Sequence, residues 1–263
     1  MQQRIRIRWT KRGRVRYVSA RDLSSVWERA LRRADLPIAY SEGFTPHAKV
    51  SFPDALPVGY DSTGEYAELT FAASIVADRD LARLSRALPD GMDILTYFEV
   101  PDGAPKLARM LRATLWELIW PAVDAAELTE LLTARGQALL AAEHVEVVRH
   151  RPDGDRTLDV RPAVLTLAAT TRPAGPGDGD GEHTVLRAVL RNDGPTVRPT
   201  DLLSALGGDG GRTPGAGAPA KVDIAAPHRI VRVAQGEVDE HGLREALTGE
   251  VEALVPDVDA EAA

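Results

Sequence analysis

Hydrophobic and polar residues alternate strictly at the start of the chain. The first run alternates arginine with apolar residues: Arg4, Ile5, Arg6, Ile7, Arg8 and Trp9. A shorter run repeats the pattern: Arg14, Val15, Arg16 and Tyr17. Successive side chains of a β-strand point to opposite faces, so the pattern predicts two strands that each carry an arginine face and an apolar face. The segment 10–13 between them ends in a glycine and predicts a hairpin turn.

Helical spacing follows the predicted hairpin. Apolar residues recur every three or four positions: Val26, Trp27, Ala30, Leu31 and Ala34. This spacing predicts a helix that Ser24 or Asp22 caps and that Pro37 ends. Leucines at helical spacing predict a second helix at 78–88. Strands are predicted at 36–40, 65–71 and 93–100, and a loop followed by a short strand at 41–52.

The order of these elements indicates the fold class. Apart from the hairpin, they follow the order β-α-β-β-α-β, which is typical of a ferredoxin-like domain with two helices on one face of an antiparallel sheet. A weaker repeat has strands at 114–120, 145–150, 157–170, 184–192 and 228–233, and helices at 124–142 and 200–206. We therefore predict an α+β protein with tandem ferredoxin-like sandwiches and an N-terminal basic β-hairpin. The predicted domains are 1–105 and 106–235, followed by an acidic, largely disordered tail at 236–263.

Charge is distributed unevenly along the chain. Residues 1–50 hold 12 Lys and Arg against 4 Asp and Glu, a net charge of +8. The remaining residues hold 20 against 35, a net charge of −15, and the segment from residue 236 holds 1 against 9. Such an asymmetry indicates an N-terminal surface that binds a polyanion.

The composition excludes several kinds of chemistry. The chain has no cysteine, which excludes disulfides, a thiolate nucleophile and an iron–sulfur cluster held by its own side chains. Its 6 histidines lack the spacing of a helical metal site, and no phosphate-loop or dinucleotide-binding motif is present. We therefore expect neither a metal nor another cofactor. No apolar run is long enough to cross a bilayer, so we expect a cytoplasmic protein.

The basic residues near the N-terminus form the predicted phosphate-binding set. Its cationic members are Arg4, Arg6, Arg8, Lys11, Arg12, Arg14, Arg16, Arg29, Arg32, Arg33 and Lys49. Its loop members are Ser41, Gly43, Phe44 and His47. For any single arginine a solvated outer face is the better explanation. Five arginines on one face, with two basic residues in the turn, favour a phosphate-binding surface.

Several single residues allow two interpretations. His47 follows Pro46 in the loop and is a candidate general acid or base, or a phosphate contact. Phe44 and Tyr40 are candidates for stacking on unpaired bases, although a loop phenylalanine also commonly packs on the core. Asp159 and Arg161 lie two positions apart, which favours an ion pair or a structural turn contact.

Several motifs in the same order resemble a bacterial family. They are residues 11–19 (KRGRVRYVS), 22–23 (DL), 28–34 (ERALRRA), 36–47 (LPIAYSEGFTPH), 56–59 (LPVG) and 159–162 (DVRP). The chain resembles the DUF2344 family, also called the radical SAM-linked or radical SAM-associated proteins. The resemblance is dense over the first seventy residues or so and sparse afterwards. Ala20 stands where the family usually has a histidine, and Glu42 where a glutamine is common.

The resemblance implies a partner rather than a reaction. That partner is a separate radical SAM protein, and a chain without cysteine fits the role of its companion. The substitution at Ala20 implies that the histidine usually found there has an auxiliary role. The predicted tandem architecture also resembles the RNA-binding folds of CRISPR repeat-processing endonucleases, at the level of fold alone.

Three functional hypotheses follow. The leading one is a non-catalytic RNA-binding accessory subunit that works with a radical SAM enzyme in tRNA or rRNA modification or processing. The first alternative is an RNA endonuclease or transferase with His47 as general acid or base. The second is a protein-interaction adaptor that binds the radical SAM partner and makes no contact with RNA.

Overall fold

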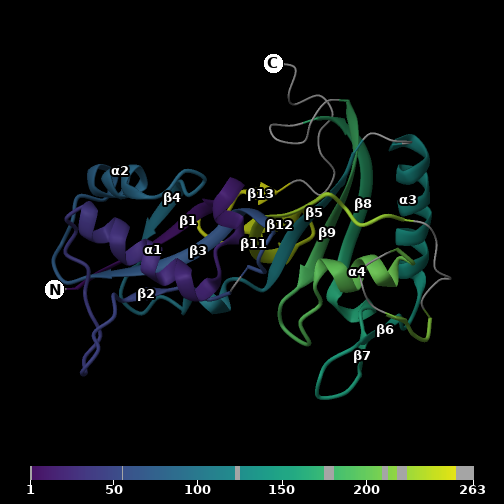
Figure 1. The fold of residues 1–263 in the computed structure, drawn as a ribbon, viewed down its shortest axis with the longest axis horizontal. Helices are drawn as coiled ribbons and strands as arrows, with labels where there is room; N and C mark the ends of the chain where they lie inside the picture. The colour runs from purple at the N-terminus through teal and green to yellow at the C-terminus, as the bar shows by residue number, and fades with distance from the viewer. Residues whose placement is uncertain are drawn as a thin grey trace. The chain divides into compact units, whose positions relative to one another are not determined.

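The protein is an α+β structure with mostly antiparallel strands. A computed structural model describes residues 2–54, 56–121, 125–174, 181–208, 213–217 and 224–252, which include four α-helices (Figure 1). The chain divides into two compact units. The first comprises Met1–Leu111, Arg232–Gln235 and Glu245–Glu250. The second comprises Arg112–Val231, Gly236–Arg244 and Val251–Ala263.

The first unit is built on a small antiparallel sheet. Its main elements are β1 (Gln3–Lys11), α1 (Ala20–Arg33), β2 (Val50–Ser51), β3 (Asp61–Phe71), α2 (Ala77–Ala87) and β4 (Ile94–Glu99). Strand β1 lies between β3 and β4, and β2 pairs with β3. Two short 3-10 helices, η1 (Gly13–Tyr17) and η2 (Leu107–Arg109), lie outside the sheet strands.

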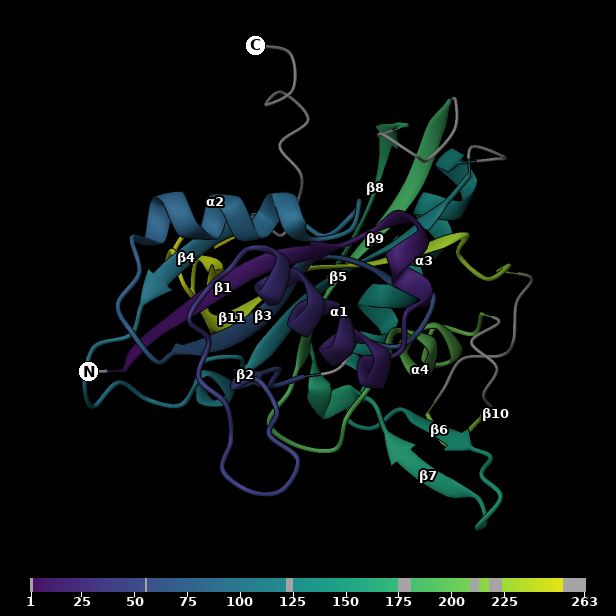
Figure 2. The same ribbon diagram turned by 60° about the vertical axis from the view of Figure 1, so that its left-hand side comes forward.

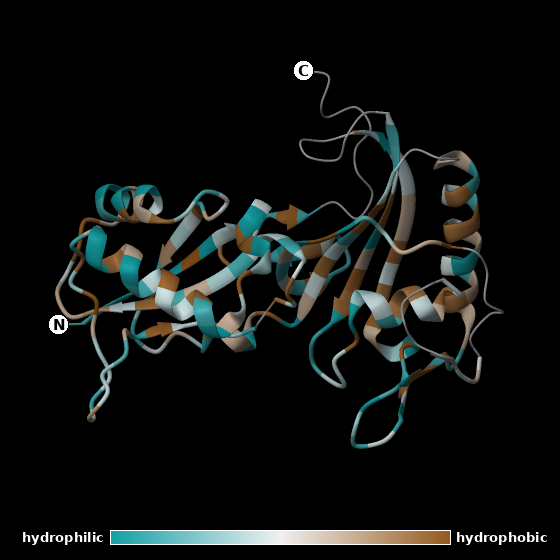
Figure 3. Cartoon of the chain, viewed as in Figure 1, coloured by the Kyte–Doolittle hydropathy of each residue, from teal (hydrophilic) through white to brown (hydrophobic). Residues whose placement is uncertain are grey.

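One face of this sheet holds the hydrophobic core. Ile5, Ile7 and Trp9 of β1 are fully buried, as their alternation with arginine predicts. They share one cluster with residues of both helices, including Trp27 of α1 and Leu84 of α2, so both helices pack on this face (Figure 2). Figure 3 shows hydrophilic and hydrophobic residues interspersed along α1 and α2, as expected for helices with one buried side.

The predicted N-terminal hairpin is wrong. Strand β1 continues to Lys11, and the second alternating run forms the 3-10 helix η1. The physical reason is that β3 and β4 already pair with the two sides of β1, so no edge remains for a further strand. Within η1 only Val15 is buried, whereas Tyr17 is 60% exposed.

The arginine face of β1 is covered rather than open. Arg6 is 1% exposed, and its Nε donates to Glu68 Oε2 at 2.8 Å, directly across the β1–β3 pair. Arg6 also donates to the Pro105 carbonyl and to Met110 Sδ, in the segment that contains η2. The sequence indicated that these arginines share a face but did not indicate what covers that face.

The neighbours of Arg6 are similarly engaged. Arg4 reaches Glu68 at 3.4 Å, and Arg8 donates to the backbone carbonyls of Thr63 and Val233 at 2.9 and 3.0 Å. Lys11 is buried, its Nζ donates to the Val18 carbonyl at 2.8 Å, and burial lowers its pKa. The prediction of an open phosphate-binding face on β1 is therefore wrong for the buried Arg6 and Lys11, whereas Arg4 and Arg8 remain partly exposed.

The second unit also combines helices with antiparallel strands. Its elements are β5 (Ala113–Trp120), α3 (Ala125–Ala141), β6 (Glu146–Arg149), β7 (Arg156–Asp159), η3 (Arg161–Ala163), β8 (Val164–Pro173), β9 (Glu182–Arg191), α4 (Pro199–Ala205), β10 (Thr213–Pro214), β11 (Arg229–Asp239), β12 (Gly242–Glu245) and β13 (Val251–Glu252). Residues of β11 and β12 are divided between the units. Strand β9 pairs with β5 and β8, α3 packs against β8 and β9, and β10, β6 and β7 form a separate small sheet.

Two expectations for the second half need correction. The single strand predicted at 157–170 is two strands, β7 and β8, because the turn η3 with Pro162 separates them. The predicted disordered tail is ordered from 236 to 252: β11 extends to Asp239, and β12 pairs with β13 around the fully buried Leu243. Burial of Leu243 compensates for the high charge of the segment. The remainder of the predicted tail, 253–263, lies outside the described residues.

Replacing Arg6 tests whether the covered arginine face is structural. We expect Arg6→Ala to lower the free energy of unfolding by about 3 kcal/mol, because it leaves Glu68 without its closest cation in a mostly buried site. Arg14→Ala is the matched control, since Arg14 is exposed and its loss is expected to change stability by less than about 0.5 kcal/mol. Urea unfolding followed by circular dichroism measures both, and equal effects would contradict the assignment.

Candidate nucleic-acid interface

A loop between α1 and β2 extends away from the first unit. Its two sides are joined by a bridge between Tyr40 and Ala48 and by the Ser41 backbone N–H, which donates to the His47 carbonyl at 2.8 Å. The Ser41 hydroxyl in turn accepts from the His47 backbone N–H at 3.0 Å. Figures 1 and 2 both show the loop reaching beyond the sheet.

The tip of this loop presents an aromatic side chain to solvent. Phe44 has a relative exposure of 109%, so it makes no core contact and the packed alternative is wrong. It follows Gly43, whose φ of +119° is a conformation that other residues rarely adopt. A fully exposed aromatic ring is suited to stacking on an unpaired base.

A pocket of about 460 Å³ lies at the base of the loop. It is lined by Arg21, Ser24, Ser25, Glu28, His47, Ala48, Val50 and Phe52. Phe52 also belongs to an aromatic cluster, with ring centroids 6.4 Å from Trp9 and 6.1 Å from Trp27. The pocket therefore combines an apolar lining, fixed to the core of the unit, with a polar one.

Helix α1 supplies the polar lining of the pocket. Arg21, Ser24 and Glu28 recur at intervals of three and four, which places them on one side of a helix with 3.6 residues per turn. The helix starts at Ser19, whose hydroxyl accepts from the Asp22 backbone N–H at 3.2 Å, rather than at the predicted caps. The polar spacing on α1 was the signal in the sequence that could have identified these pocket residues.

Glu28 and His47 face each other across the pocket lining. His47 Nδ1 lies 3.8 Å from Glu28 Oε1, and the exposed fractions of the two side chains are 72% and 23%. The other contacts of the Glu28 carboxylate are also long: 3.5 Å to the Ala48 backbone nitrogen and 3.4 Å to Arg32 Nη2. Because a strong charged hydrogen bond is about 2.7–2.9 Å long, this carboxylate retains capacity to accept from a ligand.

The predicted cations of the first unit separate into two groups. Among the predicted cations in the described part of the chain, Arg12, Arg14, Arg29 and Lys49 are exposed and form no ion pair. Arg21, which is not among the predicted residues, shares both properties. The others have partners: Arg16 reaches Asp61 and Tyr17, Arg32 reaches Glu28, and Arg33 donates to the Ala87 carbonyl. The open positive charge therefore lies on η1, α1 and the loop rather than on β1.

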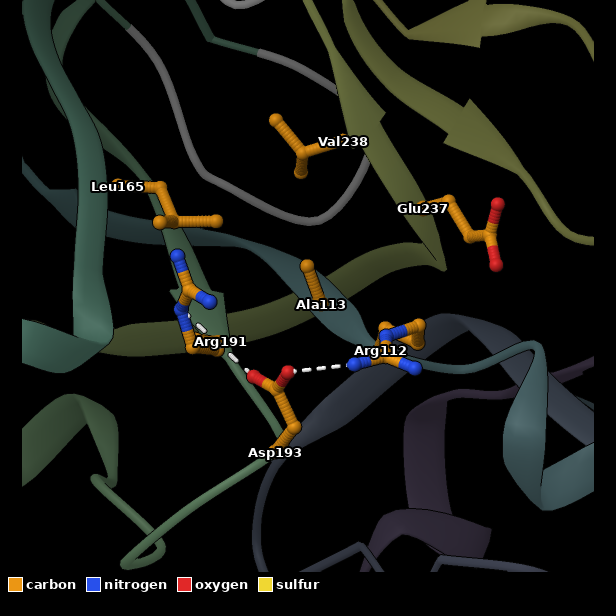
Figure 4. A pocket seen from close by; sticks show the side chains of 7 residues that line it. All are labelled: Arg112, Ala113, Leu165, Arg191, Asp193, Glu237 and Val238. Atoms are coloured by element: carbon orange, nitrogen blue, oxygen red, sulfur yellow. Dashed lines mark hydrogen bonds and ion pairs between the residues drawn. The ribbon is translucent and has the colours of Figure 1, made fainter.

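A second pocket, of about 380 Å³, lies in the second unit. It is lined by Arg112, Ala113, Leu165, Arg191, Asp193, Glu237 and Val238 (Figure 4). Asp193 lies between the two arginines, 2.7 Å from Arg112 Nη2 and 3.6 Å from Arg191 Nε. The hydrogen bond from Arg112 lowers the pKa of Asp193. Because Asp193 pairs with both guanidinium groups and Glu237 adds a second negative charge to the lining, we rank this pocket behind the first as an anion site.

The motif at 159–162 has a structural role. Arg161 donates to the carbonyls of Leu140 and Ala142 at 2.8 and 3.2 Å and so satisfies backbone groups at the end of α3. Asp159 accepts from the backbone nitrogens of Val145 and Arg161, both at 3.1 Å. Of the two interpretations of this pair, the turn contact is confirmed. Asp159 also reaches the exposed His144 Nδ1 at 2.8 Å.

Metal-binding groups and membrane-spanning helices are both absent from the described residues. These residues include no group of three or more histidine and acidic side chains that could hold a metal ion. They also include no helix of the length and hydrophobicity needed to span a bilayer.

Comparisons with known proteins place the sequence in a wider context. Residues 4–199 match the family described as "Uncharacterized protein conserved in bacteria (DUF2344)". No curated protein matches the chain. Among solved structures, a Cas6 product complex is 19% identical with a TM-score of 0.19, and a Cas6 substrate mimic complex is 17% identical with a TM-score of 0.18. Both alignments cover 78% of this chain and 89% of the other. TM-scores this low do not establish a shared fold.

The His144–Asp159 pair predicts a pH dependence. The hydrogen bond to Asp159 raises the pKa of His144 above its usual value of 6.5, so the folded state holds this proton more tightly than the unfolded state. The resulting stabilisation is complete below the unfolded pKa and is lost as the pH rises through the folded pKa. We expect this component of the pH dependence to be absent in His144→Gln. Urea unfolding at several pH values measures it, and identical profiles for both proteins would contradict the prediction.

Proposed function

The chain belongs to the DUF2344 family, and we propose that it is a non-catalytic RNA-binding subunit. The binding surface consists of the loop 40–49, the pocket at its base and the exposed cations of η1 and α1. Exposed arginines contact phosphates, and the pocket and Phe44 contact bases and sugars. Phosphate contacts of this kind make affinity depend on salt and little on sequence.

The exposure of Phe44 is the observation that carries this proposal. Leaving a phenylalanine ring in water forgoes the roughly 1.5–3 kcal/mol that burying it would contribute. The proposed surface also holds cations, with Lys49 in the same loop and Arg21 at the pocket, beside two acidic residues, Glu42 and Glu28. Proteins that bind single-stranded nucleic acid combine solvated aromatic rings with exposed cations, and the first unit carries both.

The proposal includes a radical SAM partner that modifies or processes the bound tRNA or rRNA. It rests on the family resemblance and on the absence of cysteine, which leaves this chain without ligands for an iron–sulfur cluster. The motif at 36–47 carries much of the resemblance, and its residues 40–47 lie in the loop 40–49, whereas Leu36, Ile38 and Ala39 are buried. If the surface instead docks the partner protein, RNA affinity will be absent and partner binding will depend on the same arginines.

We also propose that both units are ferredoxin-like. In the first unit the strand order β4-β1-β3-β2 fits the chain order β1-α1-β2-β3-α2-β4, with all neighbours antiparallel. In the second unit the order β11-β5-β9-β8 fits the chain order β5-α3-β8-β9-α4-β11. The small sheet of β6, β7 and β10 is then an insertion. Both orders support the split β-α-β arrangement.

A catalytic role for His47 is the second candidate. The observation that favours it is the position of His47 beside Glu28 in the pocket, 3.8 Å apart. A carboxylate beside an imidazole orients the ring, which general acid–base catalysis requires. Because His47 and Glu28 lie 3.8 Å apart, beyond hydrogen-bond length, and His47 is 72% exposed, we rank this function below binding.

Binding to labelled single-stranded RNA tests the leading proposal. We expect Phe44→Ala to weaken binding about 5- to 150-fold, because a stacked base contributes about 1–3 kcal/mol.

We expect the double variant Arg14→Ala/Arg21→Ala to reduce the slope of log affinity against log salt by roughly 1.4, since each phosphate contact contributes about 0.7. Fluorescence anisotropy at several salt concentrations measures both.

The matched control for the double variant is Arg151→Ala/Arg156→Ala, which removes two exposed arginines from the second unit. We expect its salt slope to stay close to that of the wild type. Absence of salt-sensitive RNA binding by the wild type, or equal losses in both double variants, would overturn the proposed surface.

Incubation of the protein with the same RNA separates binding from catalysis. Because the leading proposal assigns no reaction to this chain, we expect the RNA to remain intact on denaturing gels. Cleavage that disappears in His47→Ala while RNA affinity is retained would instead establish the second candidate. Cleavage that persists in His47→Ala would point to a contaminating nuclease, and repurification would remove it.

A further inference from the structure

Side chains of opposite character are ordered along the α1 side of the first-unit pocket. Arg21 lies toward the start of the helix, Ser24 and Ser25 follow one turn later, and Glu28 lies a further turn along. At a rise of 1.5 Å per residue, Arg21 and Glu28 are separated by about 10 Å along the helix axis. The pocket therefore has a cationic end, a hydroxyl-bearing middle and an anionic end.

The anionic end of the pocket constrains which ligand can bind, because the exposed cations around the pocket favour a polyanion and Glu28 does not. A carboxylate repels a nearby phosphate, so Glu28 weakens binding unless it accepts a hydrogen bond from another part of the ligand. Its contacts, all between 3.4 and 3.8 Å, leave that capacity open. A ligand that fits must present an anion near Arg21 and a hydrogen-bond donor near Glu28.

We infer that the pocket holds one ribonucleotide of the bound RNA and that Glu28 accepts a hydrogen bond from its ribose 2′-hydroxyl. The phosphate lies at the Arg21 end beside the two serines, and the base lies against the apolar lining formed by Ala48, Val50 and Phe52. Glu28 is thereby a specificity-determining residue that favours RNA over DNA. This inference rests on the proposed function and deepens it by naming the sugar as the recognised group.

The pocket lining favours the sugar over the base as the donor. The flat face of a base is stabilised most by contact with the apolar part of the pocket, where Phe52 packs against Trp9 and Trp27. The ribose joins base to phosphate, so it must lie between the apolar lining and Arg21. Its 2′-hydroxyl is a donor that DNA lacks, and it is the group by which proteins distinguish the two nucleic acids.

The ratio of RNA to DNA affinity tests the inference. Anisotropy titrations would compare a single-stranded RNA with a DNA of the same sequence, for the wild type and for Glu28→Gln. A hydrogen bond to a charged group is worth about tenfold or more in affinity, and loss of the charge also relieves repulsion of DNA. We expect the wild type to prefer RNA and the RNA-to-DNA ratio to fall about tenfold or more in Glu28→Gln.

Asp35→Asn is the matched control. It removes one negative charge just beyond the end of α1, at an exposed residue outside the pocket lining, and asparagine tolerates the φ of 48° at this position. We expect its RNA-to-DNA ratio to match that of the wild type.

A scan of single 2′-deoxy substitutions in the RNA, with the wild-type protein, gives a readout that does not depend on any variant folding. In an RNA short enough to bind in one register, we expect one position of that scan to weaken binding by a similar factor.

The outcomes separate this inference from the proposed function. If the wild type binds RNA with salt dependence but Glu28→Gln leaves the ratio unchanged, the inference is overturned and the proposed function stands. A changed base preference with an unchanged ratio also overturns it, because the donor is then on the base. Failure of the wild type to bind any RNA would overturn both.

Discussion

Burial of both faces of β1 is the constraint on which the first unit depends. Ile5, Ile7 and Trp9 enter the core beneath α1 and α2, while Arg6 on the opposite face is enclosed by β3 and the segment around η2. Enclosing a guanidinium is costly unless a carboxylate compensates it, and Glu68 does so from the neighbouring strand. The Arg6–Glu68 pair helps to fix the register of β1 against β3. A slip of one residue would separate the two charges and leave one buried without a partner, in addition to moving the apolar residues out of the core.

The same constraint determines where positive charge remains available. Arginines that are buried inside the unit cannot contact a phosphate. The predicted cations that remain exposed therefore lie on η1, α1 and the loop 40–49. The aromatic contacts of Trp9 with Trp27 and Phe52 connect β1 to this surface, because Phe52 also lines the pocket. The core and the candidate site therefore share one set of side chains.

Buried ion pairs recur in both units. Arg232 is enclosed beside Glu65 at 3.1 Å in the first unit, and Arg187 lies 2.7 Å from Glu117 in the second. Such pairs contribute little net stability compared with apolar replacements, but losing one partner is strongly destabilising. In an arginine-rich chain, many cations therefore have structural roles, and counting them overestimates the surface available to a polyanion.

The sequence by itself determined the apolar face of β1, the two helices of the first unit and most strands of the second, because burial of a hydrophobic stripe leaves a local period of two or 3.6. It also marked the loop with Gly43, Phe44 and His47. Only the tertiary structure decided that residues 14–17 form a turn, that Arg6 and Lys11 are interior, and that residues 236–252 are ordered. It also brought Glu28 and His47 together. These features depend on which distant segment covers a given face, and local periodicity holds no information about that.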